Sequence, residues 1–144
     1  MKLLLFSTLN LKQTGEFSTL GDKYPHLSDT FSKYLCIGFN GNGDPLCIDE
    51  TQEAIVVELD HESNFQRRFM NTSIPQLAES LLLFSTLIVK TIEQNGNDTY
   101  LNNNIPEEVQ HWFYDEIACI DLPALYEGSF WASKYLKLTE GPWS

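Results

Sequence analysis

The sequence lacks the features that would assign it to an enzyme or to a membrane. Its histidines, His26, His61 and His111, lie in separate segments and match no metal-binding or catalytic spacing. The apolar runs at residues 3–6 and 81–89 are too short to cross a bilayer, which takes about 20 residues. Residues 3–6 are also too short for the apolar part of a secretion signal. We therefore expect a cytoplasmic protein with no enzymatic activity and no membrane partner.

Cysteine is also scarce, and its spacing forms no pair motif. Cys36 and Cys47 fall in expected strands and Cys119 in an expected helix, all among apolar neighbours, so we expect three buried, reduced thiols. Residues 40–51 fail the calcium-loop pattern because Pro45 stands where that loop needs glycine. The sequence therefore predicts no metal ion and no cofactor. A small hydrolase that uses a histidine with a cysteine or an aspartate from a distant segment stays open as a further hypothesis.

Basic residues are outnumbered by acidic ones. The chain has 144 residues, of which 20 are acidic and 9 are basic, for a net charge of −11. Nucleic acids and anionic membranes both attract cationic surfaces, so this charge argues against either as a partner. The excess of acid fits a basic protein partner, or it serves solubility alone. At this length we expect a single domain over residues 1–144.

Residues 34–60 carry the clearest structural signal. Two apolar runs, 34–39 and 46–48, flank the polar segment 40–45. The Asn-Gly pair in that segment tolerates the positive φ angles that tight hairpin turns require. A third run, residues 54–59, follows a polar turn and puts Ile55, Val57 and Leu59 on one face and Glu58 on the other. This stretch therefore predicts a three-stranded antiparallel meander.

The rest of the chain reads as one more strand followed by helices. Residues 65–70 fit a fourth strand that carries an exposed pair of arginines. Ser73 and Gln76 form a capping box in front of a long helix that ends at residues 95–96. Later helices are expected to start near Pro106, after Asp121 and at a cap formed by Ser129. Strands grouped before helices predict an α+β fold, with an antiparallel sheet of four or more strands followed by C-terminal helices packed on one face.

Two features give no such signal. Residues 1–33 show no clear element and read as a divergent or shortened N-terminal part, in which residues 3–11 fit either a short helix or an edge strand. The heptapeptide Leu-Leu-Leu-Phe-Ser-Thr-Leu occurs at residues 3–9 and again at 81–87. Two copies at that distance do not indicate a repeat architecture, and we have no physical explanation for them.

The layout of charge is more informative than its total. Seven acidic residues and no basic ones lie between residues 34 and 66, and eight acidic residues and no basic ones lie between 91 and 133. A solvated sheet face explains the first group, and so does a docking surface for a cationic protein. On the second interpretation, the candidate partner-binding residues lie in hairpin turns and on the outer strand face: Asp44, Asp49, Glu50, Glu53, Glu58 and Asp60.

Three short segments, taken in order, carry a family resemblance. They are Ile-Gly-Phe-Asn-Gly-Asn-Gly-Asp at 37–44 with Cys-Ile-Asp at 47–49, Phe-Met-Asn-Thr-Ser at 69–73, and Ile-Asp-Leu-Pro-Ala-Leu at 120–125 with Phe-Trp at 130–131. With these segments the chain resembles the SUKH superfamily, of Smi/Knr type, and is most similar to its fourth subgroup. The turn at residues 51–53 departs from the family pattern because it lacks a glycine.

The resemblance implies an α+β immunity protein that binds and neutralises a bacterial toxin, often a nuclease, without catalysis. Because members vary their contact surface with the toxin, the resemblance implies no fixed set of contact residues. Together with the acidic charge, it gives the first hypothesis, an immunity protein for a basic, nuclease-type toxin. The alternative is an intracellular regulatory or scaffold module of the same fold with no toxin partner.

Overall fold

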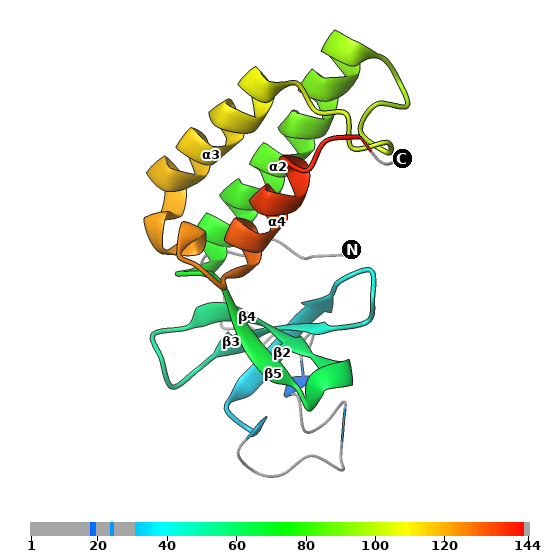
Figure 1. Ribbon diagram of the computed structural model, residues 1–144. Coiled ribbons are helices and arrows are strands. Elements are labelled where there is room, and N and C mark those ends of the chain that lie inside the picture. The colour runs from blue at the N-terminus through cyan, green and yellow to red at the C-terminus, as the bar shows by residue number, and fades with distance from the viewer. Residues whose placement is uncertain (1–17, 20–23, 25–30, 143–144) are drawn as a thin grey trace. The chain divides into compact units, whose positions relative to one another are not determined.

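A computed structural model describes residues 18–19, 24 and 31–142 (Figure 1). The chain divides into two compact units, residues 1–77 and 78–144, which we name the sheet unit and the helical unit. The expected single domain stays a prediction. The helix or strand suggested for residues 3–11 lies outside the described residues.

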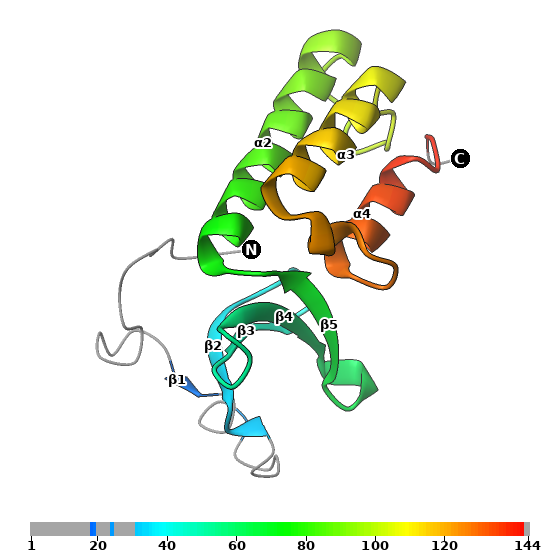
Figure 2. The same ribbon diagram turned by 90° about the vertical axis from the view of Figure 1, so that its left-hand side faces the viewer.

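The sheet unit contains a five-stranded antiparallel sheet whose strands are neighbours in chain order (Figures 1 and 2). The strands are β1 (Ser18–Thr19), β2 (Tyr34–Phe39), β3 (Pro45–Asp49), β4 (Ile55–Asp60) and β5 (Gln66–Asn71). A single turn of 3-10 helix, η2 (His61–Ser63), connects β4 to β5. The predicted meander and fourth strand are confirmed, and β1 adds a short strand beside β2 that the sequence did not reveal.

Strand register assigns alternating side chains to two faces of the sheet. Cys36 lies opposite Cys47, and Cys47 lies opposite Val57. These three side chains are buried in one core cluster, together with Tyr34 and Leu59. On the other face Leu46 lies opposite Glu58, and both are buried. The expected solvated strand face is therefore wrong, because side chains on both faces of the sheet are shielded from water.

The two turns that flank β3 reach left-handed backbone in different ways. In the turn between β2 and β3, Gly43 has a φ of 85°, and the Asn40 N–H donates to the Asp44 carbonyl at 3.0 Å. This is the tight turn that the Asn-Gly pair predicts. In the turn between β3 and β4, Glu53 and Ala54 have φ values of 55° and 62° although neither is glycine. Such a backbone costs about 1 kcal/mol or more per residue, so neighbouring groups must hold this turn in place.

The helices begin and end close to the predicted residues. They are α2 (Ile74–Asn95), α3 (Glu107–Asp121), the 3-10 turn η3 (Leu122–Leu125) and α4 (Phe130–Leu138). The Ser73 hydroxyl accepts the Gln76 backbone N–H at 3.3 Å, which confirms the cap of α2. Gly96 follows α2 with a φ of 106°, as a C-terminal cap requires. Ser129 does not cap α4 as expected, because its hydroxyl donates to the Ala124 carbonyl at 2.6 Å.

Aromatic rings from three helices form the core of the helical unit. Phe84 of α2, Phe113 of α3 and Trp131 of α4 have ring centroids 6.0 Å apart in each pair. Edge-on and tilted contacts of this kind add to the stability gained by burying the rings. The three helices of this unit therefore share one apolar centre.

Cysteine burial differs between the two units. Cys36 and Cys47 are buried free thiols, as the sequence predicts. Cys119 is exposed on α3, so the expectation that all three thiols are buried is wrong. Its side chain falls on the outer side of a helix whose inner side carries Phe113 and Ile117.

The order of elements confirms the predicted α+β class, with an antiparallel sheet followed by C-terminal helices. Antiparallel strands need only short turns between them, which is why residues 34–71 suffice for four strands. Within residues 18–19, 24 and 31–142, no helix combines the length and the apolarity needed to cross a membrane.

Candidate functional site

The six predicted contact residues separate into two groups at opposite ends of β4. Glu58 and Asp60 lie at the end beside the β2–β3 turn, where Asp44 precedes β3. The β3–β4 turn lies at the other end. Asp49 closes β3, and Glu50 and Glu53 follow it in the turn. Along β4 the two ends are about 17 Å apart, at roughly 3.3 Å per residue. The six carboxylates therefore do not form one continuous patch.

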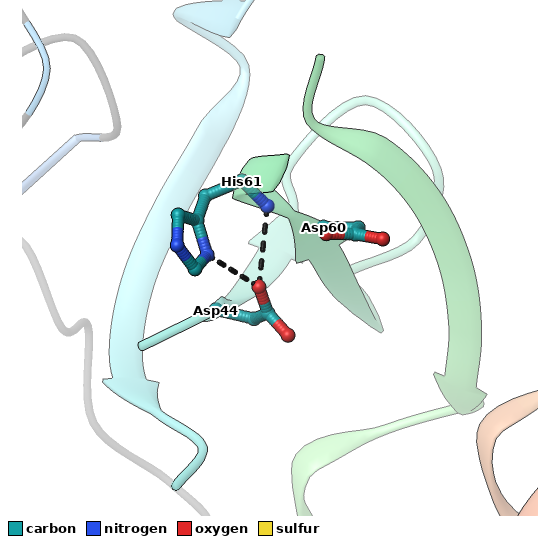
Figure 3. A group of neighbouring side chains, drawn as sticks. All are labelled: Asp44, Asp60 and His61. Carbon is teal, nitrogen blue, oxygen red and sulfur yellow. Dashed lines mark hydrogen bonds and ion pairs between the residues drawn. The ribbon is translucent and has the colours of Figure 1, made fainter. Parts of the chain in front are cut away.

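At the first end, Asp44 and His61 form a close pair (Figure 3). The Asp44 Oδ1 atom lies 2.6 Å from His61 Nδ1 and accepts the His61 backbone N–H at 3.2 Å. Only 8% of Asp44 is exposed. Burial alone would raise the pKa of its carboxyl, but hydrogen bonds from Asn40 and His61 outweigh burial and hold that pKa below its ordinary value. Asp44 is therefore an ionised, internally satisfied group.

Asn40 ties this end of the sheet together. Its Nδ2 atom donates to Asp44 Oδ2 and to Glu58 Oε2, each at 2.9 Å. Its Oδ1 atom accepts the backbone N–H groups of Asn42 and Asp44 inside the turn. Glu58 is 4% exposed and forms an ion pair with Arg68 on the adjacent strand. The β2–β3 turn is thus fixed by a side chain that joins two buried carboxylates.

Asp44, Asp60 and His61 also have the residue types of a metal site. One candidate ligand atom from each lies within 4.8 Å of the others. An ionised carboxylate can only accept, so the 2.6 Å contact requires His61 Nδ1 to carry a proton that points at Asp44. Asp60 Oδ1 accepts the Glu62 backbone N–H at 3.0 Å and caps η2. Asp44 Oδ1 and His61 Nδ1 are thus bonded to each other (Figure 3) and Asp60 Oδ1 to the backbone of η2, so we assign no metal to this cluster.

At the second end, the Asp49 carboxylate is fully buried. It accepts the Thr51 backbone N–H at 2.9 Å and the Thr51 hydroxyl at 2.7 Å, and it forms an ion pair with Arg67 at 2.8 Å. Lys33 Nζ lies 3.7 Å away. Burial works to raise the pKa of Asp49, but these bonds and charges outweigh it and keep that pKa below its ordinary value.

Arg67 links β5 to the strained turn. Besides Asp49, its guanidinium donates to Gln52 Oε1 at 2.7 Å and reaches the Tyr34 hydroxyl at 3.4 Å. Because Gln52 and Thr51 belong to the turn that contains the left-handed Glu53, these bonds hold that backbone in place. Asp49 and Arg67 therefore stabilise the β3–β4 turn through their bonds to Thr51 and Gln52.

The structure leaves three of the six predicted residues accessible to a partner. Glu50 and Glu53 are exposed and Asp60 is partly exposed. Asp44, Asp49 and Glu58 are buried, so the premise that they line a solvated surface is corrected. Their burial follows from cationic or amide partners on neighbouring strands, which satisfy the carboxylates away from water. A role of these residues in partner binding stays a prediction.

Sequence reasoning missed the partners of the buried acids. Arg67 and Arg68 were expected as an exposed pair, but they lie on opposite faces of β5 and each reaches a buried carboxylate. Asn40 and His61 were assigned no role. The available signal was the pairing of an acidic strand with a basic one in a hairpin, since opposite charges on adjacent strands attract.

Comparison with protein families matches residues 11–137 to the SUKH-4 immunity proteins. No curated protein and no solved structure matches the chain significantly. The family match covers the sheet from β1 to β5 and nearly all of the helices that follow. It also includes the Asn40 turn, the buried carboxylates and both arginines. The chain belongs to the SUKH-4 immunity protein family.

Proposed function

We propose that this protein neutralises a bacterial toxin domain that has a basic, nucleic-acid-binding surface, and that it does so by binding, without catalysis. Membership of an immunity protein family supports toxin neutralisation. A nuclease needs a cationic surface to hold its substrate, and an acidic protein can cover that surface. The net charge of −11 has the sign that this partner requires.

One observation carries the proposal: five of the six Lys and Arg side chains in the described part of the chain contact an acidic or aromatic group of the protein itself, and the sixth is the exposed Lys137. Arg67 and Arg68 pair with buried carboxylates, and Lys33 lies near Asp49. Lys90 of α2 lies over the ring of Trp112, with Nζ 4.8 Å from its centroid. Lys134 of α4 lies over the ring of Phe84 in the same way, at 4.9 Å. Because these cations lie against groups of the protein, the acidic excess of the chain dominates its surface and gives it a negative field.

The two ends of the sheet contribute differently to this proposal. Glu50 and Glu53 of the β3–β4 turn, with Asp60, offer carboxylates to the toxin. The buried Asp49 and its partner Arg67 act on this surface by fixing the shape of that turn. Surface charges of this kind act mainly on the association rate, because they steer the partner before contact.

The test uses the toxin domain encoded by the adjoining gene. We expect co-expression with this protein to restore growth of cells that make the toxin, and the purified protein to inhibit the cleavage of nucleic acid by the toxin. Failure of the wild-type protein to bind that domain, or binding to a toxin domain with no cationic surface, would overturn the proposal.

The contact residues are tested separately. The double change E50K/E53K should lower the association rate constant about 10-fold, because it reverses charge in the field that steers the toxin. The matched control E79K/E93K makes the same change in net charge at exposed positions on α2. Equal rates for the two variants would show that net charge acts without any contribution from the turn.

A further inference from the structure

Helix α3 carries a stripe of exposed side chains along one side. Glu108, His111, Asp115, Cys119 and Leu122 are all exposed. The first four are spaced by three, four and four residues, which puts them on one side of the helix, and Leu122 follows in η3 after the non-helical backbone of Asp121. The opposite side is the buried one and includes Val109, Phe113 and Ile117. The exposed stripe is therefore a defined surface of the helical unit.

Charge on this surface is not neutralised by neighbours. Of the four exposed acids on α3, Glu107 alone has an ion-pair partner within 4 Å among the described residues, and this partner is His111 at 3.8 Å. The other exposed acids of α3 are Glu108, Asp115 and Glu116. Their field extends to α4: burial comes first in raising the pKa of Tyr135, and Tyr114, Asp115 and Glu107 raise it further.

Apolar and aromatic side chains border the acids. Leu122 is 54% exposed at the end of the stripe, and Tyr126 is 61% exposed just after η3. Tyr114 is 41% exposed, and its ring lies 4.9 Å from that of Tyr135. Exposed tyrosines are typical of the residues that contribute most to protein–protein binding. Acids alone would serve solubility, whereas this combination suits specific contact.

We propose that the α3 stripe, with Tyr114 and Tyr126 beside it, is a docking surface for the cationic toxin domain. This inference rests on the proposed function and adds a contact surface in the helical unit. Charge complementarity selects the occupant, because two copies of this chain would bring like-charged stripes together. In this arrangement the acids of the stripe steer and orient the toxin, and Leu122 and Tyr126 supply the apolar contact that keeps it bound.

The first experiment measures the kinetics of binding to the toxin domain encoded by the adjoining gene. E108K/D115K should lower the association rate constant about 10-fold. Tyr126→Ala should raise the dissociation rate constant about 10-fold while association changes little. The control E79K/E93K, at exposed positions of α2, should leave both rate constants within about 3-fold of wild type. Urea unfolding of each variant establishes that the fold is intact.

The second experiment uses Cys119 as a probe of the same surface. Maleimide should label Cys119 at least about 10-fold more slowly in the complex than in the free protein, because a bound protein covers the stripe. In the control, Ser85→Cys is combined with Cys119→Ser, so that an exposed position of α2 carries the single accessible thiol. Its labelling should not change when the toxin binds.

The outcomes separate this inference from the proposed function. If the wild-type protein does not bind the toxin domain, the proposed function fails. If it binds, but E108K/D115K and Tyr126→Ala bind like wild type and Cys119 stays open to maleimide, the α3 surface is wrong and the proposed function stands. Concentration-dependent protection of Cys119 in the free protein would show that a second copy occupies the stripe, which also overturns the inference.

Discussion

Arg67 and Arg68 of the sheet unit each reach a buried carboxylate, whereas Lys90 and Lys134 of the helical unit lie over aromatic rings. The same types of charge therefore have different effects in the two units. In the sheet unit, opposite charges on neighbouring strands neutralise each other in ion pairs and help to fix the β2–β3 and β3–β4 turns. In the helical unit, Lys90 and Lys134 form cation–π contacts, and the exposed acids of α3 face water. The number of acidic residues in a segment does not distinguish paired carboxylates from exposed ones, whereas the burial of each side chain does.

The largest expected contrast between the units is in thiol reactivity. Cys119 of the helical unit should react with a thiol reagent in the folded protein, whereas Cys36 and Cys47 should react orders of magnitude more slowly. A hydrogen bond with Cys36 comes first in raising the pKa of the Cys47 thiol, and burial adds to it. Titration with Ellman's reagent should give one fast equivalent in buffer and three in denaturant. Fast reaction of all three thiols in buffer would show that the sheet core opens.

The next largest effect is expected from removing a buried carboxylate. Asp49→Ala leaves Arg67, Lys33 and the Thr51 hydroxyl without their acceptor. We expect it to lower the free energy of unfolding by about 3 kcal/mol, as measured by urea denaturation. The neighbouring Glu50→Ala should change it by less than about 0.5 kcal/mol, because Glu50 is exposed. Similar losses for both variants would contradict the division into buried and accessible acids.

Acid should destabilise the protein through the same buried groups. The folded-state pKa of Asp44 and of Asp49 is lowered from the ordinary value of 3.8. Each therefore stabilises the fold above that pH, and this contribution is lost as the pH falls from about 3.8 through the lower folded-state pKa. Asp49→Asn should make the fall in unfolding free energy with acidity less steep. Asp115→Asn in the helical unit is the control, and an equal change in slope for both would contradict the assignment.

The smallest stability effect should come from the α3 stripe. Replacing its two acids in E108Q/D115Q removes like charges from an exposed surface and breaks no ion pair among the described residues. We expect the free energy of unfolding to change by less than about 0.5 kcal/mol. A loss of more than about 2 kcal/mol would show that these acids serve the fold, and would remove the contrast with Asp49.

Local chemistry was enough to predict much of the fold. The Asn-Gly pairs within residues 40–43 predicted the hairpin, in which Gly43 takes the positive φ, and Ser73 with Gln76 predicted the start of α2. Alternation also gave the correct sides for the residues of β4. Family motifs then indicated the function class before any geometry was available, and the family match confirms that class.

Exposure of the candidate site could not be predicted in the same way, because it depends on residues far away in the sequence. Asp44 is satisfied by His61, 17 positions away, and Asp49 by Arg67, 18 positions away. Such pairs exist only once strand register is fixed. The sequence did show eight acids without bases between residues 91 and 133. Deciding which of these face water required the helical periodicity of α3 to be combined with its burial.

The measurement that tests the central claim most directly is the salt dependence of toxin association. If exposed, unneutralised acids steer a cationic toxin domain, the association rate constant of the wild-type protein should fall at least about 10-fold between about 20 mM and 500 mM NaCl. E108K/D115K should flatten that dependence, and E79K/E93K should keep most of it. An association rate that does not change with salt in the wild-type protein would contradict the account.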